Sequence, residues 1–336
     1  PRNSGWTGAE YDKGRNMTKG ATIVFMGTPD FAVPSLQRLA ARHHIKAVMS
    51  QPPRPGGRGM KIRPSPVHAM ADQLGLPVET PEKLDDEAMA MIKSHAPDFL
   101  IVVAYGLILP EPVLALPAKA AINGHASLLP RWRGAAPIHR AIAAGDSITG
   151  TTAMLMARAL DSGPMLVKRE EVIRTDDTAA SLHDRLADLT ATTLLEAVDR
   201  FDSLTPTPQD ESAVTWAEKI SPAEAEMDFT LPAEEAERRI RAFAPFPGAW
   251  FAIPRDADAP HRIKVLAARR VDGKGQPGQV LGRGQAGGPV LACGTGALEL
   301  MRIQPQGKPV MDGAAFLNGN ALPDRIDPAL NLRGQG

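Results

Sequence analysis

The stretch Asp98-Phe-Leu-Ile-Val-Val-Ala-Tyr105 decides the fold. A short, unbroken apolar run of this kind is typical of a strand that is buried on both faces, as the strands of parallel sheets are. Similar runs at 22–26 and 45–49 and near Val78 alternate with amphipathic stretches at 30–42, 65–74 and 85–95. Alternating strands and helices predict an α/β domain with a Rossmann-like parallel sheet and right-handed crossovers.

Three polar residues after this run suggest chemistry. Asn123 and His125 are two positions apart, so on an extended strand their side chains lie on the same face. Asp161 follows between two further predicted strands, at 152–156 and 165–172. An amide, an imidazole and a carboxylate can stabilise an oxyanion, carry a proton and orient the carrier, which suits acyl transfer. We expect them at the carboxyl edge of the sheet, where open α/β folds bind ligands.

Each of these residues alone has an ordinary structural explanation. A lone histidine beside a proline-rich loop is commonly a hydrogen-bonded loop residue, and Asn-Gly and Asp-Ser-Gly commonly form turns. The longer pattern is more specific, and it reads Asn123-x-His125-x-Ser127-Leu-Leu-Pro130, Gly134-Ala-Ala-Pro137 and Leu160-Asp-Ser-Gly163. It closely resembles the formyltransferases that use 10-formyltetrahydrofolate. Phe25-Met-Gly-Thr-Pro-Asp-Phe31 and Val103-Ala-Tyr-Gly-Leu-Ile-Leu-Pro110 extend the resemblance to their tRNA-specific branch, over residues 20 to 325.

The resemblance implies transfer of the formyl group of 10-formyltetrahydrofolate to the amino group of methionyl initiator tRNA. It places the catalytic residues at Asn123, His125 and Asp161. It places the folate pocket at Ser127, Leu128, Leu129 and Pro130, with a second wall at Tyr105, Gly106 and Leu107. One departure is Gly124, where the family usually has an apolar, often β-branched residue, and this predicts a locally less stiff strand.

A basic segment precedes the second predicted helix. Its basic residues are Arg54, Arg58, Lys61 and Arg63, with no acid among them, in a loop too rich in Gly and Pro to be core. Such a loop can bend around a phosphate backbone. The resemblance implies that it enters the acceptor end of the tRNA, with Arg58 the most important residue. The alternative is a lid over the folate.

The second half of the chain differs in composition. Residues 203–221 are polar and proline-containing and are predicted to form a linker after a catalytic domain at 20–202. Residues 222–330 contain one predicted helix, at 233–244, and short apolar runs separated by glycine-rich turns, which favours a small barrel. The resemblance implies an open β-barrel of the oligonucleotide-binding type that helps to hold tRNA. Between positions 238 and 308, twelve Lys or Arg residues face four acids.

Composition excludes several classes of protein. The 336 residues carry no net charge, and 43% are hydrophobic. The single cysteine, Cys293, cannot form an intramolecular disulfide or a thiolate metal site, and we see no metal motif. No apolar run approaches the roughly 20 residues of a membrane helix. The turn after the first predicted strand, Gly27-Thr-Pro-Asp30, lacks the Gly-x-Gly-x-x-Gly fingerprint, which argues against a nicotinamide oxidoreductase. We therefore expect a soluble, cytoplasmic protein that requires no metal, and the resemblance implies a monomer that binds folate and tRNA.

Residues 1–19 form a polar tail, which we expect to be in part an upstream extension or a cloning remnant, with Met17 as the natural start. Three other functions stay open. The same chemistry could act on a small amine, such as a nucleotide sugar or glycinamide ribonucleotide. The chain could be a non-catalytic RNA-binding module, or it could hydrolyse formylfolate with water in place of the amine.

Overall fold

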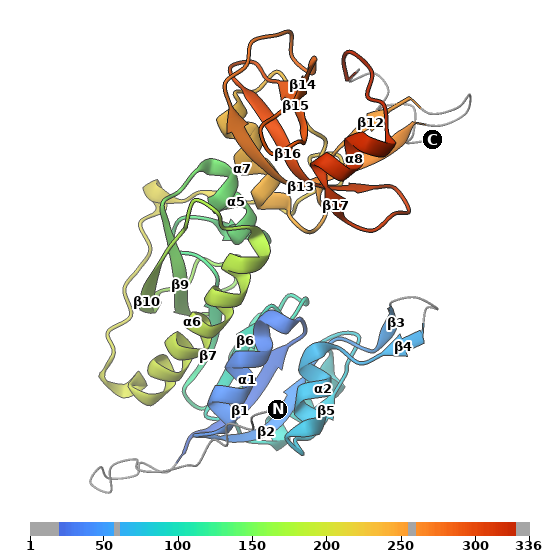
Figure 1. Ribbon diagram of the computed structural model, residues 1–336. Coiled ribbons are helices and arrows are strands. Elements are labelled where there is room, and N and C mark those ends of the chain that lie inside the picture. Colours follow the sequence, from blue (N-terminus) through green and yellow to red (C-terminus); the bar gives the residue numbers. More distant parts are fainter. Residues whose placement is uncertain (1–19, 57–60, 255–259, 327–336) are drawn as a thin grey trace, which may run out of the picture.

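The computed structural model describes residues 20–56, 61–254 and 260–326. The tail at 1–19 and Arg58 lie outside these ranges. Figure 1 shows two lobes, an α/β lobe coloured blue to yellow and a lobe coloured orange to red, which meet where α5 (Pro137–Ala144) lies beside α7 (Ala233–Phe243). Among the described helices, none is both long enough and apolar enough to cross a membrane.

The first lobe is built on a mixed sheet. Within the described ranges it has seven strands in the order β10-β9-β7-β6-β1-β2-β5. Five of them are parallel: β1 (Thr22–Gly27), β2 (His44–Met49), β5 (Val78–Glu79), β6 (Phe99–Val103) and β7 (Ala120–His125). The predicted Rossmann-like parallel sheet is therefore confirmed. Strand β9 (Ile148–Leu155) runs antiparallel to β7. Strand β10 (Met165–Val172) pairs antiparallel with β9 and therefore runs in the same direction as the five parallel strands.

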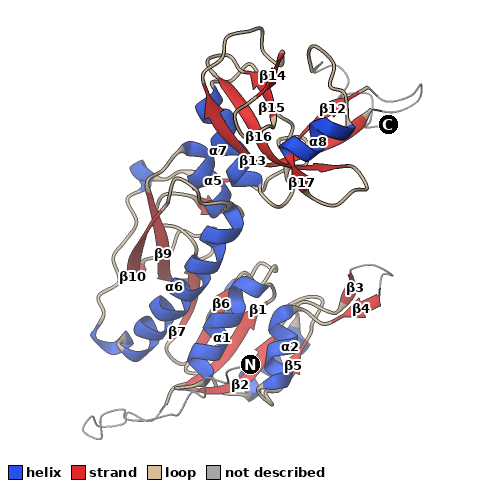
Figure 2. Ribbon diagram, in the orientation of Figure 1, coloured by secondary structure: helices blue, strands red, loops and turns tan. Residues whose placement is uncertain are grey.

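The helices of this lobe cover the sheet, as Figure 2 shows for α1 (Val33–Ala40), α2 (Pro66–Gln73) and α6 (Ala179–Asp199). This lobe also contains α3 (Asp86–Ser94), the short α4 (Glu111–Leu114) and α5. Successive residues of β1 enter different cores. Ile23 and Phe25 pack in one core with α1 and α6, whereas Val24 and Met26 pack in a second core with α3. Burial on both faces explains why these strands are continuously apolar.

Asp177 anchors the start of α6. Its buried carboxylate accepts both terminal N–H groups of Arg185 (2.6 and 2.7 Å), the Arg174 N–H (2.7 Å) and the Ser181 hydroxyl (2.8 Å). The Arg185 guanidinium, with these other donors, holds the pKa of Asp177 well below its usual range. The backbone carbonyl oxygen of Asp177 accepts a hydrogen bond from the Arg241 guanidinium of α7 (3.0 Å), so the same turn joins the two lobes.

We expect Asp177→Asn to lower the free energy of unfolding by about 2 to 3 kcal/mol at pH 7, because Arg185 loses its ion pair. Because the pKa of Asp177 is lower in the folded state than its value of about 3.9 in the unfolded chain, the ionised carboxylate stabilises the folded state at pH values above about 3.9. This contribution is lost as the pH falls toward the pKa of the folded state. Urea unfolding at pH 7 and near pH 3 should therefore show a smaller difference from wild type in acid. Asp184→Asn, on the exposed side of the same helix, is the control. Equal differences at both pH values would contradict this role.

The second lobe contains antiparallel strands, as expected. Its described strands run in the order β12-β13-β16-β15-β14, with β17 (Met311–Asp312) added beside β16. Their bounds are Ala249–Ile253 (β12), His261–Val271 (β13), Val280–Arg283 (β14), Pro289–Ala292 (β15) and Ala297–Pro305 (β16). The order does not return to its first strand among the described residues, so the sheet is open. Helices α7 and α8 (Gly313–Gly319) cover it.

The interdomain segment, residues 203–221, returns along the first lobe. Figure 1 shows it in yellow, running from the end of α6 beside β10 toward α5. Thr207 exchanges two backbone hydrogen bonds of 2.8 Å with Met165, at the start of β10. Further on, β11 (Trp216–Ala217) pairs in parallel with β8 (Arg133–Gly134). The segment predicted as a linker thus adds hydrogen bonds to two parts of the first lobe.

Candidate active site

Strand β7 positions Asn123 and His125. Asn123 lies opposite Val102 of β6, and His125 lies opposite Thr152 of β9. Gly124 faces the other side, toward α6, where an added Cβ would lie 2.7 Å from the Thr190 methyl carbon and 2.9 Å from a Leu194 methyl carbon. Glycine therefore allows α6 to approach the strand closely. The structure thus gives this position a packing role that the sequence did not predict.

A buried pair of threonines supports the end of the same strand. The Thr151 hydroxyl donates to the His125 carbonyl oxygen (3.1 Å) and lies 2.9 Å from the Thr190 hydroxyl. Neither threonine is exposed to solvent. The close approach at Gly124 brings Thr190 to this position, so the backbone of His125 is held from behind.

The His125 ring is held at both nitrogens. Nε2 lies 2.8 Å from the Trp132 carbonyl oxygen, and because a carbonyl can only accept, Nε2 carries the proton of that hydrogen bond. Nδ1 then faces the Asp161 carboxylate at 3.6 Å. His125 therefore presents Nδ1, and not Nε2, to the space shared with Asp161.

Asp161 lies in the turn between β9 and β10. One carboxylate oxygen accepts the Gly134 N–H (2.9 Å), and the other lies 3.5 Å from the Asn123 amide nitrogen. Only 7% of the His125 side chain and 10% of the Asp161 side chain are exposed, so their charges act with little screening by water. The structure thus brings together the three residues that the sequence predicted. This arrangement can stabilise developing negative charge and transfer a proton.

The predicted folate stretch after β7 forms a tight, internally bonded turn. Ser127 and Leu129 are completely buried. The Ser127 hydroxyl donates to the Arg131 carbonyl (2.6 Å), and Thr152 bonds both the Ser127 carbonyl (2.7 Å) and the Leu129 N–H (3.2 Å). Only Leu128 and Pro130 of this stretch are partly exposed. These two residues are therefore the ones that a ligand could reach.

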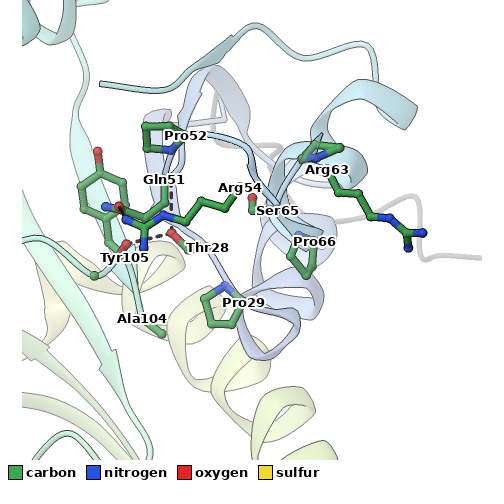
Figure 3. Close-up of a pocket in the computed structure, with 12 residues that line it drawn as sticks. Thr28, Pro29, Gln51, Pro52, Arg54, Arg63, Ser65, Pro66, Ala104 and Tyr105 are labelled. Atoms are coloured by element: carbon green, nitrogen blue, oxygen red, sulfur yellow. Dashed lines mark hydrogen bonds between the residues drawn. The ribbon is translucent and has the colours of Figure 1, made fainter. Parts of the chain in front are cut away.

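A hollow of about 490 Å³ lies beside the site, at the carboxyl ends of β1, β2 and β6. Ala104, on its wall, is two residues beyond the one that pairs with Asn123, so the hollow and the three polar residues share one edge of the sheet. Figure 3 shows its lining. Arg54 extends toward Gln51, and Arg63 points in the opposite direction. The lining residues are Thr28, Pro29, Gln51, Pro52, Arg54, Arg63, Pro64, Ser65, Pro66, Ala104, Tyr105 and Gly106.

The second predicted folate wall contributes mainly backbone. The Tyr105 side chain packs in the second core, where burial raises the pKa of its phenol to about 12, so it stays protonated near neutral pH. Its carbonyl oxygen accepts the Thr28 hydroxyl (2.8 Å) at the edge of the hollow. Gly106 is exposed and Leu107 is half-buried. Gly106 and Leu107 are thus the accessible residues of this wall.

The basic segment forms a hairpin that projects from the sheet in Figure 1. Arg54 begins β3 (Arg54–Gly56), and Lys61 and Arg63 belong to β4 (Lys61–Arg63). All three side chains are exposed, and they form no ion pair among the described residues. Ile62, between them, is 72% exposed. The hairpin therefore presents unpaired positive charge beside an apolar side chain.

Sequence reasoning assigned no role to Trp132, Gly134 or Thr28, although Gly134 was part of the longer pattern. Gly134 has a φ of 117°, which explains why glycine is needed where its N–H reaches Asp161. In the described part of the chain, no three His, Cys, Asp or Glu side chains gather as a metal site would require.

Comparison with known proteins identifies the family. The family model described as formyl transferase matches residues 21–198, and the model of the formyl transferase C-terminal domain matches residues 219–321. The chain belongs to the formyl transferase family. The cluster of Asn123, His125 and Asp161 therefore lies within the matched N-terminal region, and the interdomain segment lies largely between the two matched regions.

Similar proteins cover nearly the whole chain. Methionyl-tRNA formyltransferase of Paracoccus denitrificans is 50% identical over 309 residues, which are 91% of this chain and 99% of that protein. The protein of the same name from Ruegeria pomeroyi is 51% identical over 90% of this chain and 98% of its own length.

Solved structures share the fold of this formyl transferase. An N-formyltransferase from Helicobacter canadensis, in complex with folinic acid and dTDP-3-aminofucose, has a TM-score of 0.61 at 15% identity, and the match covers 84% of this chain and 99% of that one. HypX from Aquifex aeolicus, in complex with tetrahydrofolic acid, has a TM-score of 0.60 at 17% identity, covering 90% of this chain and 47% of that one.

Proposed function

We propose that this chain transfers the formyl group of 10-formyltetrahydrofolate to the amino group of methionyl initiator tRNA. The observation that carries the proposal is the identity of about half of all residues, across 99% of a relative's length, to a methionyl-tRNA formyltransferase. Identity over both lobes matters, because the matched length then includes the basic hairpin as well as the C-terminal lobe.

The three polar residues fit this reaction. The amine nitrogen forms a bond to the formyl carbon, the bond from that carbon to the folate nitrogen breaks, and the amine proton replaces the formyl group on the folate. Asn123 donates a hydrogen bond to the oxygen on which negative charge develops, a contribution worth about 10² to 10³ in rate. Asp161 accepts a proton from the attacking amine through water or holds the charge on His125, which faces it through Nδ1.

The accessible parts of the two predicted walls are the basis of the proposed site for the co-substrate. We assign the contacts with folate to Gly106, Leu107, Leu128 and Pro130, the members of the predicted set that ligand atoms can reach. The hollow beside them lies at the same sheet edge and is rimmed by Arg54 and Arg63. The acceptor end of a tRNA would meet these cations before it reached Asn123.

The experiment is a transfer assay with 10-formyltetrahydrofolate and four acceptors: charged initiator tRNA, charged elongator methionyl-tRNA, free methionine and an amino sugar nucleotide. We expect transfer to the initiator tRNA to exceed the others in kcat/KM. Preference for the sugar nucleotide would replace the proposal with small-amine transfer. Folate consumption without a formylated product would indicate hydrolysis.

A further inference from the structure

Asp161 has an unusual backbone conformation. Its φ is +50°, in the left-handed region that residues other than glycine seldom adopt. Gly163, two residues later, lies so close to Leu155 that an added Cβ would be 1.8 Å from the Leu155 carbonyl oxygen. The turn therefore requires outside support to keep its shape.

That support comes from Gln209 in the interdomain segment. Its side-chain amide nitrogen donates to the carbonyl oxygens of Asp161 and Gly163, each at 2.8 Å. Its amide oxygen accepts from Nε of Arg133 (3.0 Å). Both amide hydrogens and the amide oxygen are thus used within the protein, so Gln209 has no donor left for a substrate.

Arg133 connects Gln209 to the Asp161 side chain, because Arg133 is followed in β8 by the residue that bonds the Asp161 carboxylate. Its side chain is 4% exposed and ion-paired with Glu211 at 2.7 Å. Its backbone N–H donates to the Thr215 carbonyl oxygen (2.9 Å), and the next residue, Gly134, donates its N–H to the Asp161 carboxylate. Gln209 therefore links the backbone of Asp161 to the strand that holds the Asp161 side chain.

The backbone on both sides of Gln209 is attached to the first lobe, which fixes the position of Gln209 relative to Asp161. Thr207, two residues before it, is bonded to Met165, and β11, a few residues after it, is paired with β8. Both attachments are made to the first lobe. A displacement of the interdomain segment would therefore move Gln209 relative to Asp161.

We infer that Gln209 is a positioning residue for Asp161, through which the interdomain segment sets the geometry of the active site. This inference rests on the proposed function. Only an amide combines two donors with an acceptor at this place. A glutamate of the same size would put a carboxylate against two carbonyl oxygens, so Gln209→Glu removes the support without changing the volume.

The first test compares steady-state kinetics of Gln209→Glu and Gln209→Ala with wild type, using charged initiator tRNA. We expect kcat to fall by about 10-fold to 100-fold, because a small misplacement of a catalytic group has effects of that order. KM for tRNA and for formylfolate should stay within about twofold, since its hydrogen bonds within the protein leave Gln209 no free group for either substrate. Ser212→Ala is the matched control, because Ser212 is exposed and bonds only Asp210 of the same segment. Unchanged kcat in both Gln209 variants, or a rise confined to KM, would overturn the inference.

A double-mutant cycle separates positioning from general stabilisation. In an Asp161→Ala background, followed under single-turnover conditions, Gln209→Glu should lower the rate by no more than about twofold, because the group that it positions is gone. The same fold-loss in both backgrounds would show that Gln209 acts independently of Asp161.

A crystal structure of full-length Gln209→Glu decides the question without any substrate. We expect the Asp161 carboxylate to lose its 2.9 Å contact with the Gly134 N–H. Persistence of that contact and of the left-handed φ would overturn the inference. A wild-type protein that failed to formylate any methionyl-tRNA would instead contradict the proposed function, and the structural result would still stand.

Discussion

Asn123→Ala, His125→Ala and Asp161→Ala are each expected to lower kcat for formyl transfer by about 10² or more. Replacing Asn123 removes a donor to the oxyanion. Replacing Asp161 leaves His125 Nδ1 and the Gly134 N–H without their carboxylate partner. Asn123 and His125 lie at the end of β7 and Asp161 lies in a turn, so these side chains contribute more to the transition state than to the apolar cores. The midpoint of thermal unfolding and the binding of tRNA should therefore change little.

Steady-state kinetics with charged initiator tRNA, together with thermal unfolding, provides the measurement. His44→Ala is a suitable control, since His44 is exposed at the amino end of β2, away from the site edge. Near-normal turnover of Asp161→Ala would remove Asp161 from the mechanism and leave His125 to act alone.

Lys61→Ala combined with Arg63→Ala is expected to raise KM for tRNA by about 10-fold at physiological salt and to leave KM for formylfolate unchanged. Each lost phosphate contact lowers the slope of log affinity against log salt by about 0.7 to 0.9, so the double variant should lower it by about 1.4 to 1.8. Both cations are exposed and without an ion pair among the described residues, and therefore free to meet a phosphate.

The matched control is Lys46→Ala with Lys93→Ala, which removes the same charge. Lys46 lies in the first half of β2 and Lys93 in the last turn of α3, so both belong to the amino edge of the parallel sheet. An equal change of slope in the control would show that net charge alone is responsible. A rise in KM for formylfolate with the hairpin variant would instead make the hairpin a lid over the folate.

The alternation of apolar strands and helices predicted the parallel sheet, because strands such as β1 and β6 are buried on both faces. The meeting of Asn123 and His125 with Asp161 was equally predictable. The first two share a strand face, and the third lies in the turn between the next two strands.

Other features depended on contacts that no local pattern reports. The hairpin of β3 and β4 has proline and glycine where strands usually have branched residues, so it was expected to be a loop. The direction of the Tyr105 side chain is set by packing against α3 and its neighbours. Gln209 is polar and lies near two prolines, which is typical of a linker, and its partners Asp161 and Gly163 are more than 40 residues earlier in the chain.

The contact between Gly124 and α6 has a consequence for exchanging residues among relatives. The volume that a β-branched side chain would fill at 124 is already occupied by the Thr190 methyl group and by Leu194. Reducing Thr190 to alanine would make room, and it would also remove the hydroxyl that bonds Thr151 behind His125. Positions 124, 151 and 190 therefore form an epistatic set. A β-branched residue placed at 124 will therefore be tolerated only when position 190 changes with it, and that change will affect the support of His125 by Thr151.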